Sequence, residues 1–425
     1  MKKMVYVLLL SFCIFLVSCT SGEKQGQKIE SKEGRQKETE DKSQKEEKAE
    51  EKYVEVTDGT GVSRQLKLGE VNGEDEGGVF QFLGFASDYS QVVDGHYYYM
   101  RTDGLGNYTV YQDKGEKVVN FVINDSSYVN QFVKYGEAFY AFVKQDELSF
   151  SFDVLDNTLI SIDARTGAVT KIKDMTVEVA GNQFWQTGRA IFYRDFFYFE
   201  DYSDYYDVDP HGCEMRGRIS GLCLDKSLEK KRFSLTSRME SMKEKPDLSF
   251  IDGKIYYGEQ QDRTVTLFSY DLGSDVEEEI FCYERTDDKC VVVGSVKVDR
   301  DYIYCQDYMI PRKGGKMWQM PEVLDYLRFP PDGKYLFYQD RKSQIHRINK
   351  KTHKDVVICD DIQLDGMDCT EDGIYIMGVN EAWLERFGEE SWDDWADPRS
   401  NNLYYMDFDG KNRKEICKAV TELSD

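Results

Sequence analysis

Short stretches of alternating apolar and aromatic residues, each introduced by a polar turn, recur along most of the chain. This alternation, bounded by Asp-Gly and similar turns, is typical of antiparallel strands joined as hairpins. No stretch shows a clear apolar period of 3.6 residues with helix caps, so alternating helices and strands are not expected. Seven copies of a turn followed by an aromatic strand are found at Asp94–Tyr99, Tyr135–Tyr140, Gly188–Tyr193, Asp252–Tyr257, Asp299–Tyr304, Asp332–Tyr338 and Asp372–Ile376.

Two more strands follow several of these copies. The pairs are Thr158–Asp163 before Val169–Ile172, Thr266–Asp271 before Glu279–Phe281, Gln344–Ile348 before Val356–Ile358, and Leu403–Asp407 before Lys414–Ile416. With one further strand ahead of each turn, every unit becomes a four-stranded antiparallel meander, which is the blade of a β-propeller. The sequence therefore predicts an all-β fold with a single propeller over residues 53–425. We expect seven blades, with six or eight as alternatives.

Two segments of the later repeats resemble known propeller families. Phe329–Tyr338 resembles the Pro-Asp-Gly-Lys hairpin of TolB-type repeats, and Leu403–Lys414 is similar to the repeat of low-density-lipoprotein-receptor-type propellers. The chain also resembles uncharacterised lipoproteins of anaerobic Gram-positive bacteria. This resemblance implies the propeller fold and names no ligand, because such propellers have binding, scaffolding and enzymatic roles alike.

The first eighteen residues have the pattern of an export signal. Lys2 and Lys3 precede an apolar run from Met4 to Val17 that is too short to span a bilayer comfortably. The four residues that end at Cys19 resemble the bacterial lipobox, which implies a diacylglyceryl anchor, with palmitate-type chains, on that cysteine. An ordinary secretory signal is the alternative. We expect a membrane-anchored protein that faces outside the cytoplasm.

Residues 19–52 have the composition of a tether. From Thr20 to Lys52 the segment contains no Phe, Tyr or Trp, and its only aliphatic residues are Ile29 and Ala49. Such a segment has no apolar side chains from which to build a core, so it is expected to be a solvated spacer.

Charge narrows the classes of partner. The chain has a formal net charge of −24, all of which belongs to the part after residue 52. A strongly acidic body repels nucleic acid and anionic lipid surfaces, so a nucleic-acid partner is not expected. The expected partners are the membrane through the lipid on Cys19, and a glycan, a peptide or an envelope protein, with the chain itself acting as a monomer.

Three long connections suggest where a ligand binds. They run over residues 145–157, 200–217 and 380–402, and each follows the second strand of its repeat. Loops between second and third strands share one face of a propeller. Exposed aromatic rings beside carboxylates suit stacking on sugar rings or on cationic groups of peptides. The predicted ligand-binding residues are Tyr202, Tyr205, Tyr206, Asp207, Trp383, Trp392, Asp393 and Trp395. The alternative is that these rings fold the long loops onto the rims of the blades.

The sequence gives little support for a metal site or for catalysis. Asp201, Asp204, Asp207 and Asp209 are weak calcium candidates, because the Gly-containing order of a calcium loop is missing. His96, His211, His346 and His353 lack zinc-site spacing. No nucleophile elbow, phosphate loop or metalloprotease motif is present, so no catalytic residue is predicted. The main hypothesis is a ligand-binding lipoprotein, with an envelope scaffold and a carbohydrate-active hydrolase or lyase as alternatives.

Two structural points remain open in the sequence. Arg64–Leu68 is the candidate strand for closing the ring beside the last blade, after Ile416. Eight cysteines follow Cys19, and the pairs Cys213–Cys223, Cys282–Cys290 and Cys359–Cys369 have spacings that permit disulfides in an exported chain. The alternative is that they are small buried apolar residues.

Overall fold

The structure of the chain is a computed structural model. It describes residues 52–68, 80–81, 90–103, 106–123, 127–145, 158–179, 182–185, 187–201, 218–225, 227–233, 248–286, 296–305, 308–321, 325–330, 333–340, 342–379 and 401–418. Throughout these segments the secondary structure is β-strand, with no helix. Accordingly, no helix in them has the length and hydropathy needed to cross a membrane. The predicted signal peptide and lipid site, and the predicted tether up to residue 51, lie outside the described residues.

Seven sheets share one plan, in which four antiparallel strands pair in chain order. We number them along the chain. Sheet 1 contains β4 (Ser90–Val93), β5 (His96–Thr102), β6 (Asn107–Gln112) and β7 (Glu116–Val122). Sheet 2 contains β8 (Ser127–Tyr135), β9 (Ala138–Gln145), β10 (Thr158–Asp163) and β11 (Val169–Asp174). Sheet 3 contains β14 (Thr187–Tyr193), β15 (Phe196–Asp201), β16 (Arg218–Cys223) and β17 (Lys230–Arg232).

The later sheets repeat the plan with small additions. Sheet 4 contains β18 (Ser249–Ile251), β19 (Lys254–Gln261), β20 (Thr264–Asp271) and β21 (Val276–Glu284), and β3 (Phe80–Gln81) pairs with β18. Sheet 5 contains β22 (Val296–Val298), β23 (Tyr302–Cys305), β24 (Tyr308–Pro311) and β26 (Trp318–Gln319). Sheet 6 contains β27 (Asp325–Arg328), β28 (Tyr335–Gln339), β29 (Ile345–Asn349) and β30 (Asp355–Cys359). Sheet 7 contains β31 (Leu364–Cys369), β32 (Ile374–Val379), β33 (Asn401–Met406) and β34 (Lys414–Cys417).

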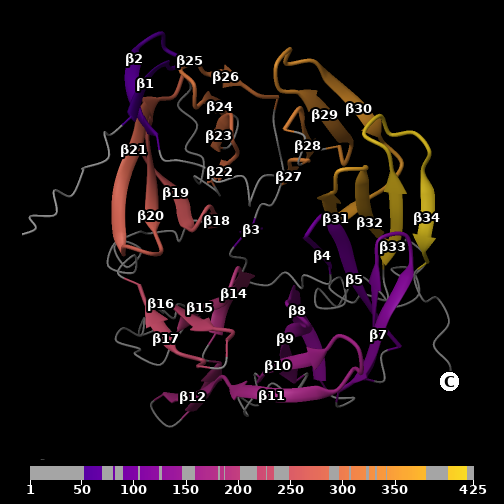
Figure 1. Cartoon of the computed structure of the whole chain (residues 1–425). Helices are drawn as coiled ribbons and strands as arrows, with labels where there is room; N and C mark the ends of the chain where they lie inside the picture. The colour runs from indigo at the N-terminus through magenta and orange to yellow at the C-terminus, as the bar shows by residue number, and fades with distance from the viewer. Residues whose placement is uncertain are drawn as a thin grey trace, which may run out of the picture. The chain divides into compact units, whose positions relative to one another are not determined.

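Most neighbouring sheets contact one another through their first strands, and sheet 3 contacts β3 at the edge of sheet 4 (Figure 1). Strand β4 contacts β8, β8 contacts β14, and β18 contacts β22. At the end of the chain β27 contacts β31, and β31 contacts β4 of sheet 1, so the last sheet packs against the first. Four-stranded antiparallel meanders that pack side by side with the first strand innermost are the architecture of a β-propeller.

The hairpin chemistry read from the sequence is confirmed at most of the predicted turns. Asp94 and Asp252 have positive φ values of 52° and 59°, and the glycine after each also has a positive φ. Two successive residues in this region form the tight turn that suits the twist of a hairpin. One copy is assigned wrongly: Gly188–Tyr193 lies in the first strand of sheet 3, and the aromatic second strand is β15. Its hairpin turn is at Arg194-Asp195, where Arg194, with a positive φ of 51°, takes the place of the aspartate and Asp195 takes the place of the glycine.

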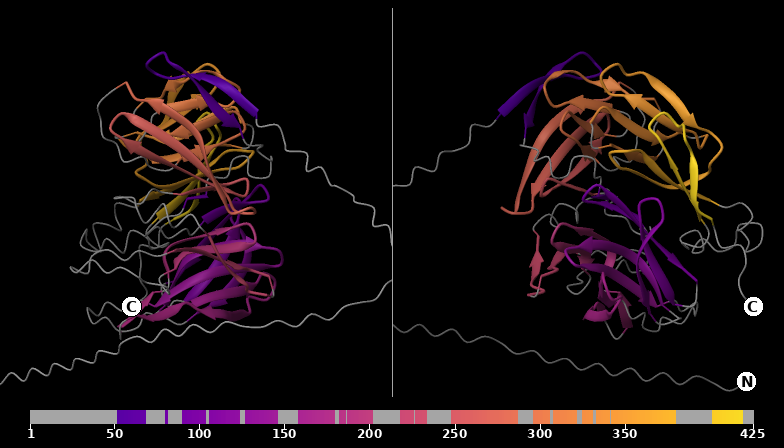
Figure 2. Two further views of the ribbon diagram at one scale, coloured as in Figure 1. Left: turned by 90° about the vertical axis from the view of Figure 1, so that its left-hand side faces the viewer. Right: turned by 45° about the vertical axis from the view of Figure 1, so that its right-hand side comes forward.

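The N-terminal segment packs away from the last sheet, which corrects the prediction for Arg64–Leu68. Strand β1 (Lys52–Thr57) pairs with β2 (Ser63–Leu68), and β1 pairs in parallel with β25 (Gly315–Lys316) beside sheet 5. Strand β2 also contacts β21 of sheet 4. Figure 2 shows this N-terminal hairpin in indigo across sheets 4 and 5. A further two-stranded hairpin is formed by β12 (Thr176–Val179) and β13 (Asn182–Trp185).

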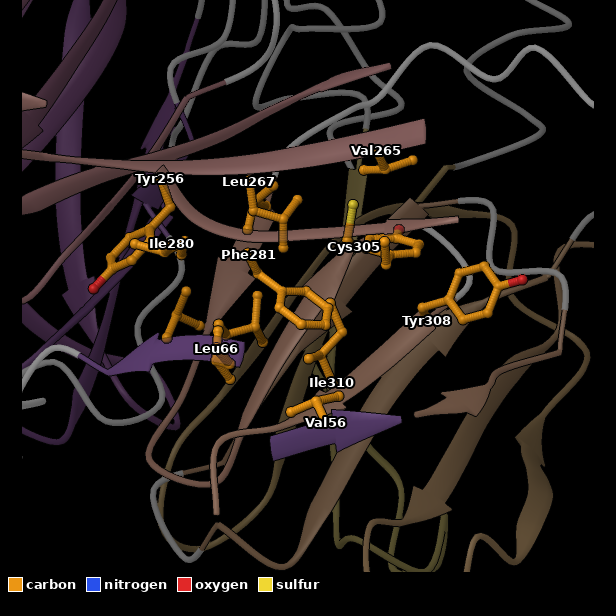
Figure 3. Packing of buried hydrophobic residues seen from close by; sticks show 14 of the residues in the cluster. Val56, Leu66, Tyr256, Val265, Leu267, Ile280, Phe281, Cys305, Tyr308 and Ile310 are labelled. Carbon is orange, nitrogen blue, oxygen red and sulfur yellow. The ribbon is translucent and has the colours of Figure 1, made fainter. Parts of the chain in front are cut away.

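The N-terminal hairpin completes the core between sheets 4 and 5. Val56 and Leu66 are fully buried and belong to one cluster with Phe281 of sheet 4 and Ile310 of sheet 5 (Figure 3). Asp58 fixes the turn of the hairpin, because its carboxylate accepts hydrogen bonds from the backbone N–H groups of Thr60 and Val62 and from other groups. The alternating pattern of residues 64–68 therefore identifies a strand correctly. Its apolar side chains pack against sheets 4 and 5 and not, as predicted from the sequence, against the last sheet.

Candidate functional site

Connections between second and third strands differ strongly in length from sheet to sheet. Sheets 1, 4, 5 and 6 have short connections, over residues 103–106, 262–263, 306–307 and 340–344. Sheets 2, 3 and 7 have long ones, over residues 146–157, 202–217 and 380–400. The predicted place of the three enlarged connections in the strand order is therefore confirmed. In a propeller these connections lie on one side of the sheets, which we call the loop face.

The side chains predicted to bind a ligand lie outside the described residues. This applies to Tyr202, Tyr205, Tyr206, Asp207, Trp383, Trp392, Asp393 and Trp395, to the calcium candidates Asp204 and Asp209, and to Cys19. Asp201 is the last residue of β15, and its backbone pairs with Thr187 and Arg218. The structure thus gives the strand ends from which these connections start and to which they return.

The loop face has a fixed point where sheet 1 meets sheet 7. Arg101, near the end of β5, donates a hydrogen bond of 2.9 Å from its guanidinium to the backbone carbonyl oxygen of Asn401. Asn401 is buried and begins β33, directly after the connection over residues 380–400. Asp103 and Asn107 close the short turn of sheet 1 through a 2.6 Å side-chain hydrogen bond. A cation from the first sheet therefore holds the return point of the longest connection.

Polar side chains also link the innermost strands of four consecutive sheets. Lys297 of sheet 5 donates to the carbonyl oxygen of Leu327 in sheet 6, at 3.4 Å. Arg328, the next residue, contacts the Asp368 carboxylate of sheet 7 through Nε at 3.4 Å. Ser90 of sheet 1 donates to the other oxygen of Asp368 at 3.2 Å. We call this row of contacts the inner belt.

Burial shapes the electrostatics of the inner belt. Desolvation raises the pKa of Asp368, although Arg328 and Ser90 both act to lower it. Desolvation and the nearby Asp368 also raise the pKa of the Tyr97 hydroxyl well above its usual value. A carboxyl with a raised pKa is a candidate for acid chemistry in many enzymes. Here, however, the two groups that contact its oxygens connect neighbouring sheets, which points to a structural role.

A second polar cluster surrounds His346 in sheet 6. Its Nδ1 is 3.0 Å from Asp355, and its Nε2 is 3.5 Å from Asp340. The ring stacks on Tyr338, whose hydroxyl donates to Asp355 at 2.8 Å. Within the described segments, no group of three or more His, Cys, Asp or Glu side chains is arranged to hold a metal ion. The cluster therefore has the form of a hydrogen-bonded clamp between three strands of one sheet.

The cysteine pair across sheets 6 and 7 is not bridged. Cys359 carries a free thiol that donates to the Asp361 carboxylate at 3.3 Å, so it forms no disulfide with Cys369. Burial raises the pKa of the Cys359 thiol. Cys223 and Cys282 are also free, while Cys213 and Cys290 fall outside the described residues. The interpretation of Cys359 as a small buried side chain is the one that the structure supports.

A small pocket lies between sheets 4 and 5 beneath β2. Its walls include Lys67, Lys254, Tyr256 and Arg312. Lys67 pairs with Glu278 at 3.1 Å, which joins the hairpin to β21. Burial raises the pKa of Tyr256 to about 12, so the phenol stays neutral at physiological pH. The alternating patterns in the sequence do not reveal this pocket, because its walls come from three separate segments.

The comparisons with known proteins give structural likeness only. No protein-family model matches the chain, and no curated protein matches it. The β-propeller domain of the Trilobed protease from Pyrococcus furiosus, described as having an open velcro topology, is 15% identical with a TM-score of 0.38 over 69% of this chain and 83% of that chain. TolB from Acinetobacter baumannii is 10% identical with a TM-score of 0.36 over 75% of this chain and 62% of that chain.

BamB from Moraxella catarrhalis is 13% identical with a TM-score of 0.34 over 71% of this chain and 82% of that chain. All three TM-scores are below 0.5. The assignment of the fold therefore rests on the strand pairing and the contacts between sheets in this chain itself.

Proposed function

We propose that the chain is a lipid-anchored, extracytoplasmic propeller that binds a glycan or a peptide on its loop face. The seven four-stranded sheets are the blades of one ring, and the lipid on Cys19 holds it at the membrane. The observation that supports this proposal most directly is the position of the three long connections. All three join second to third strands, and two of them carry the Trp, Tyr and Asp residues predicted to bind.

Contacts between the sheets are consistent with a rigid support for this face. Sheets 5, 6, 7 and 1 are joined by the inner belt, and Arg101 holds the start of β33. A binding site made of loops needs such a support, because each loop is positioned by the strands at its ends. Aromatic rings beside carboxylates supply the stacking surface and the hydrogen-bond acceptors that sugars and cationic peptide groups require.

The experiment is a binding screen of the full-length chain against glycans, cell-wall fragments and peptides. A variant with Trp392, Trp395, Tyr205 and Tyr206 replaced by alanine is compared with Tyr53→Ala, which removes an exposed ring from the N-terminal hairpin. We expect the first variant to lose binding and Tyr53→Ala to retain it. Equal binding by both variants would place the site elsewhere. A screen without any bound ligand would favour the alternative role of a protein scaffold in a cell-envelope complex.

Two narrower proposals concern the same face. Asp201, Asp204, Asp207 and Asp209 are proposed as calcium ligands, and a rise in melting temperature with calcium that disappears in Asp207→Asn/Asp209→Asn tests them. The third alternative is a carbohydrate-active hydrolase or lyase, which requires two carboxyl groups about 5 to 9 Å apart across a bound sugar. The measurement is hydrolysis or cleavage of a bound glycan. Activity that is retained in the calcium-site variant, and is lost when a single other carboxylate is replaced, would favour this alternative over simple binding.

A further inference from the structure

The outer turns of the sheets differ sharply in charge. The segment Arg312–Met317 contains three basic residues and no acidic one, and Asn349–Lys354 contains three lysines and no acidic residue. By contrast, Asp271–Glu284 in sheet 4 contains six acidic residues and no basic one. In a chain with a net charge of −24, two segments of purely positive charge are a strong local exception.

These segments are the turns between third and fourth strands, and contacts between neighbouring sheets bring them into a continuous row. Trp318 of sheet 5 stacks on His353 in the turn of sheet 6, with ring centres 4.2 Å apart and 13° between the planes. In sheet 7 the corresponding turn packs on β30 of sheet 6. A Cβ on its Gly410 would lie 2.3 Å from the carbonyl oxygen of Ile358. The three turns are therefore adjacent along the rim.

Five exposed lysines lie on this row, and we call them the basic arc: Lys316, Lys351, Lys354, Lys411 and Lys414. Across the described segments, their ammonium groups form no hydrogen bond or ion pair. Two nearby carboxylates are paired with arginines. Asp409 pairs with Arg347, and Asp361 binds Arg413 through two contacts of 2.6 and 2.8 Å. The arc thus keeps its positive charges available to solvent.

The basic arc begins beside the strand through which the chain enters the fold. Lys316 is in β25, where it is opposite Thr57 at the end of β1. Strand β1 starts at Lys52, so the predicted tether ends one strand length away, about 17 Å for five residue steps. Lys52 itself is opposite Leu68, whose neighbour Lys67 pairs with Glu278 of the acidic segment, so the end of the tether lies beside sheet 4 and one strand length from the arc.

We propose that the basic arc lies against anionic lipid headgroups of the membrane to which the chain is anchored. This inference rests on the proposed lipid anchor at Cys19. Lysines close to an anionic surface are attracted within a Debye length, whereas the acidic turn of sheet 4 is repelled. The anchor keeps the protein near the membrane, and the arc determines which rim of the propeller faces the bilayer.

The test measures the reactivity of individual lysines in the full-length lipidated chain. The chain is reconstituted into phosphatidylcholine vesicles with or without phosphatidylglycerol, and amine acetylation is followed by mass spectrometry. Lys117 and Lys171 are the controls, since both are exposed and belong to sheets 1 and 2. We expect phosphatidylglycerol to lower the reactivity of the five arc lysines about fivefold, to leave the controls unchanged, and to lose its effect at high salt.

Charge-matched variants make the test independent of chemical modification. Lys316→Gln/Lys354→Gln/Lys411→Gln removes three charges from the arc, and Lys117→Gln/Arg165→Gln/Lys171→Gln removes three elsewhere. In the first variant we expect Lys351 and Lys414 to lose their protection by phosphatidylglycerol, and in the second to keep it. Equal protection of arc and control lysines would overturn the proposal. The proposal would also be overturned if a soluble polyanion protected the arc lysines and anionic vesicles did not.

Failure of the anchor is recognised separately. A chain that carries no lipid lacks the added mass on Cys19 and does not float with vesicles of any composition. A chain that has the lipid mass and floats, yet shows no selective protection of the arc, contradicts only the inference about orientation. The two failures therefore have different signatures in the same samples.

Discussion

Two junctions between neighbouring sheets are closed in different ways. Between sheets 4 and 5 there is a cluster of sixteen buried residues, of which the N-terminal hairpin contributes two, Val56 and Leu66. Between sheets 7 and 1, where the two ends of the propeller meet, the buried cluster has five residues, of which four are tyrosines. The first junction gains an additional chain segment. In the second, the described residues include no strand that the two sheets share, and side chains make the contacts.

The two junctions differ in the contacts that hold them. At the junction of sheets 7 and 1, the rings of Tyr97 and Tyr375 stack with centres 4.2 Å apart. The Asp113–Gly115 turn of sheet 1 also reaches sheet 7, where Lys114 lies 4.3 Å above the Tyr405 ring. Stacked aromatic rings provide large buried area with defined geometry. We infer that closure depends on a few aromatic contacts, whereas the hairpin reinforces a junction that is already continuous in sequence.

The largest expected effect is that of Tyr97→Ala. The side chain is 1% exposed, and it stacks on Tyr99 as well as on Tyr375. Truncating a large buried ring costs about 3–5 kcal/mol of unfolding free energy. We expect a lower denaturation midpoint and increased hydrogen exchange in both sheet 1 and sheet 7. Tyr97→Phe is the control, because it keeps the stack and removes only the hydroxyl. Increased exchange in sheet 1 alone would contradict a closing role.

Leu66→Ala is the matching change at the other junction. Leu66 is fully buried beneath Phe281 and Ile310, so the loss is about 2–4 kcal/mol. Because the hairpin is an addition to sheets 4 and 5, we expect increased hydrogen exchange mainly in residues 52–68 and β21. Val62→Ala, at a position that is 49% exposed, is expected to be nearly neutral. Loss of protection throughout all seven sheets would show that the hairpin is as important for closure as the aromatic contacts.

Asp58→Ala tests the polar part of the same hairpin. Asp58 is fully buried, and its carboxylate accepts hydrogen bonds from Thr60, Val62 and Arg64. Although burial alone raises its pKa, these hydrogen bonds keep the pKa below the usual value. Removing the carboxylate breaks several hydrogen bonds to a charged acceptor at once, which costs about 2 kcal/mol.

The pH dependence of this contribution has a definite sign. Because the folded-state pKa of Asp58 is lowered, its stabilisation is present above the unfolded pKa of about 3.9 and is lost as pH falls through the folded value. Urea denaturation of the wild type and Asp58→Ala should therefore give a difference that is constant near neutral pH and shrinks below about pH 4. A difference that grows on acidification would contradict the assignment.

Much of the fold could be predicted from the sequence, because it follows from local patterns. Tight Asp-Gly turns and alternating aromatic strands locate most second strands, and the later third and fourth strands agree with β29, β30, β33 and β34. The partner of β2 could not be predicted this way. Alternation shows that Leu66 is buried, but it does not say against which of seven similar sheets. Sheet 3 was assigned wrongly because its hairpin turn is Arg194-Asp195 where most of the other sheets have Asp-Gly, so the turn has no recognisable signal in the sequence.

The candidate site, too, could be predicted from the sequence only where it depends on local patterns. The position of the long connections in the strand order was readable, because it depends on the repeat. The inner belt could not be predicted, because its residues are far apart in the sequence and meet only through the packing of the sheets. They are Lys297, Arg328, Asp368 and Ser90. The basic arc was partly readable: its two segments without acidic residues stand out in the sequence, but only the contacts between turns make them one surface.

Asp368→Asn has the smallest expected effect and sharpens the comparison of the two junctions. Because burial raises the folded-state pKa of Asp368, its contribution to stability is fully present below the unfolded pKa of about 3.9 and is lost as pH rises through the folded value. This is the opposite sign to Asp58. Asparagine stays neutral, so its cost is within about 1 kcal/mol, and the variant should gain stability relative to the wild type as the pH rises above the unfolded pKa of about 3.9. A relative loss as the pH rises, measured by urea denaturation, would show that the ion pair with Arg328 outweighs burial and that charge, as well as packing, joins sheets 6 and 7.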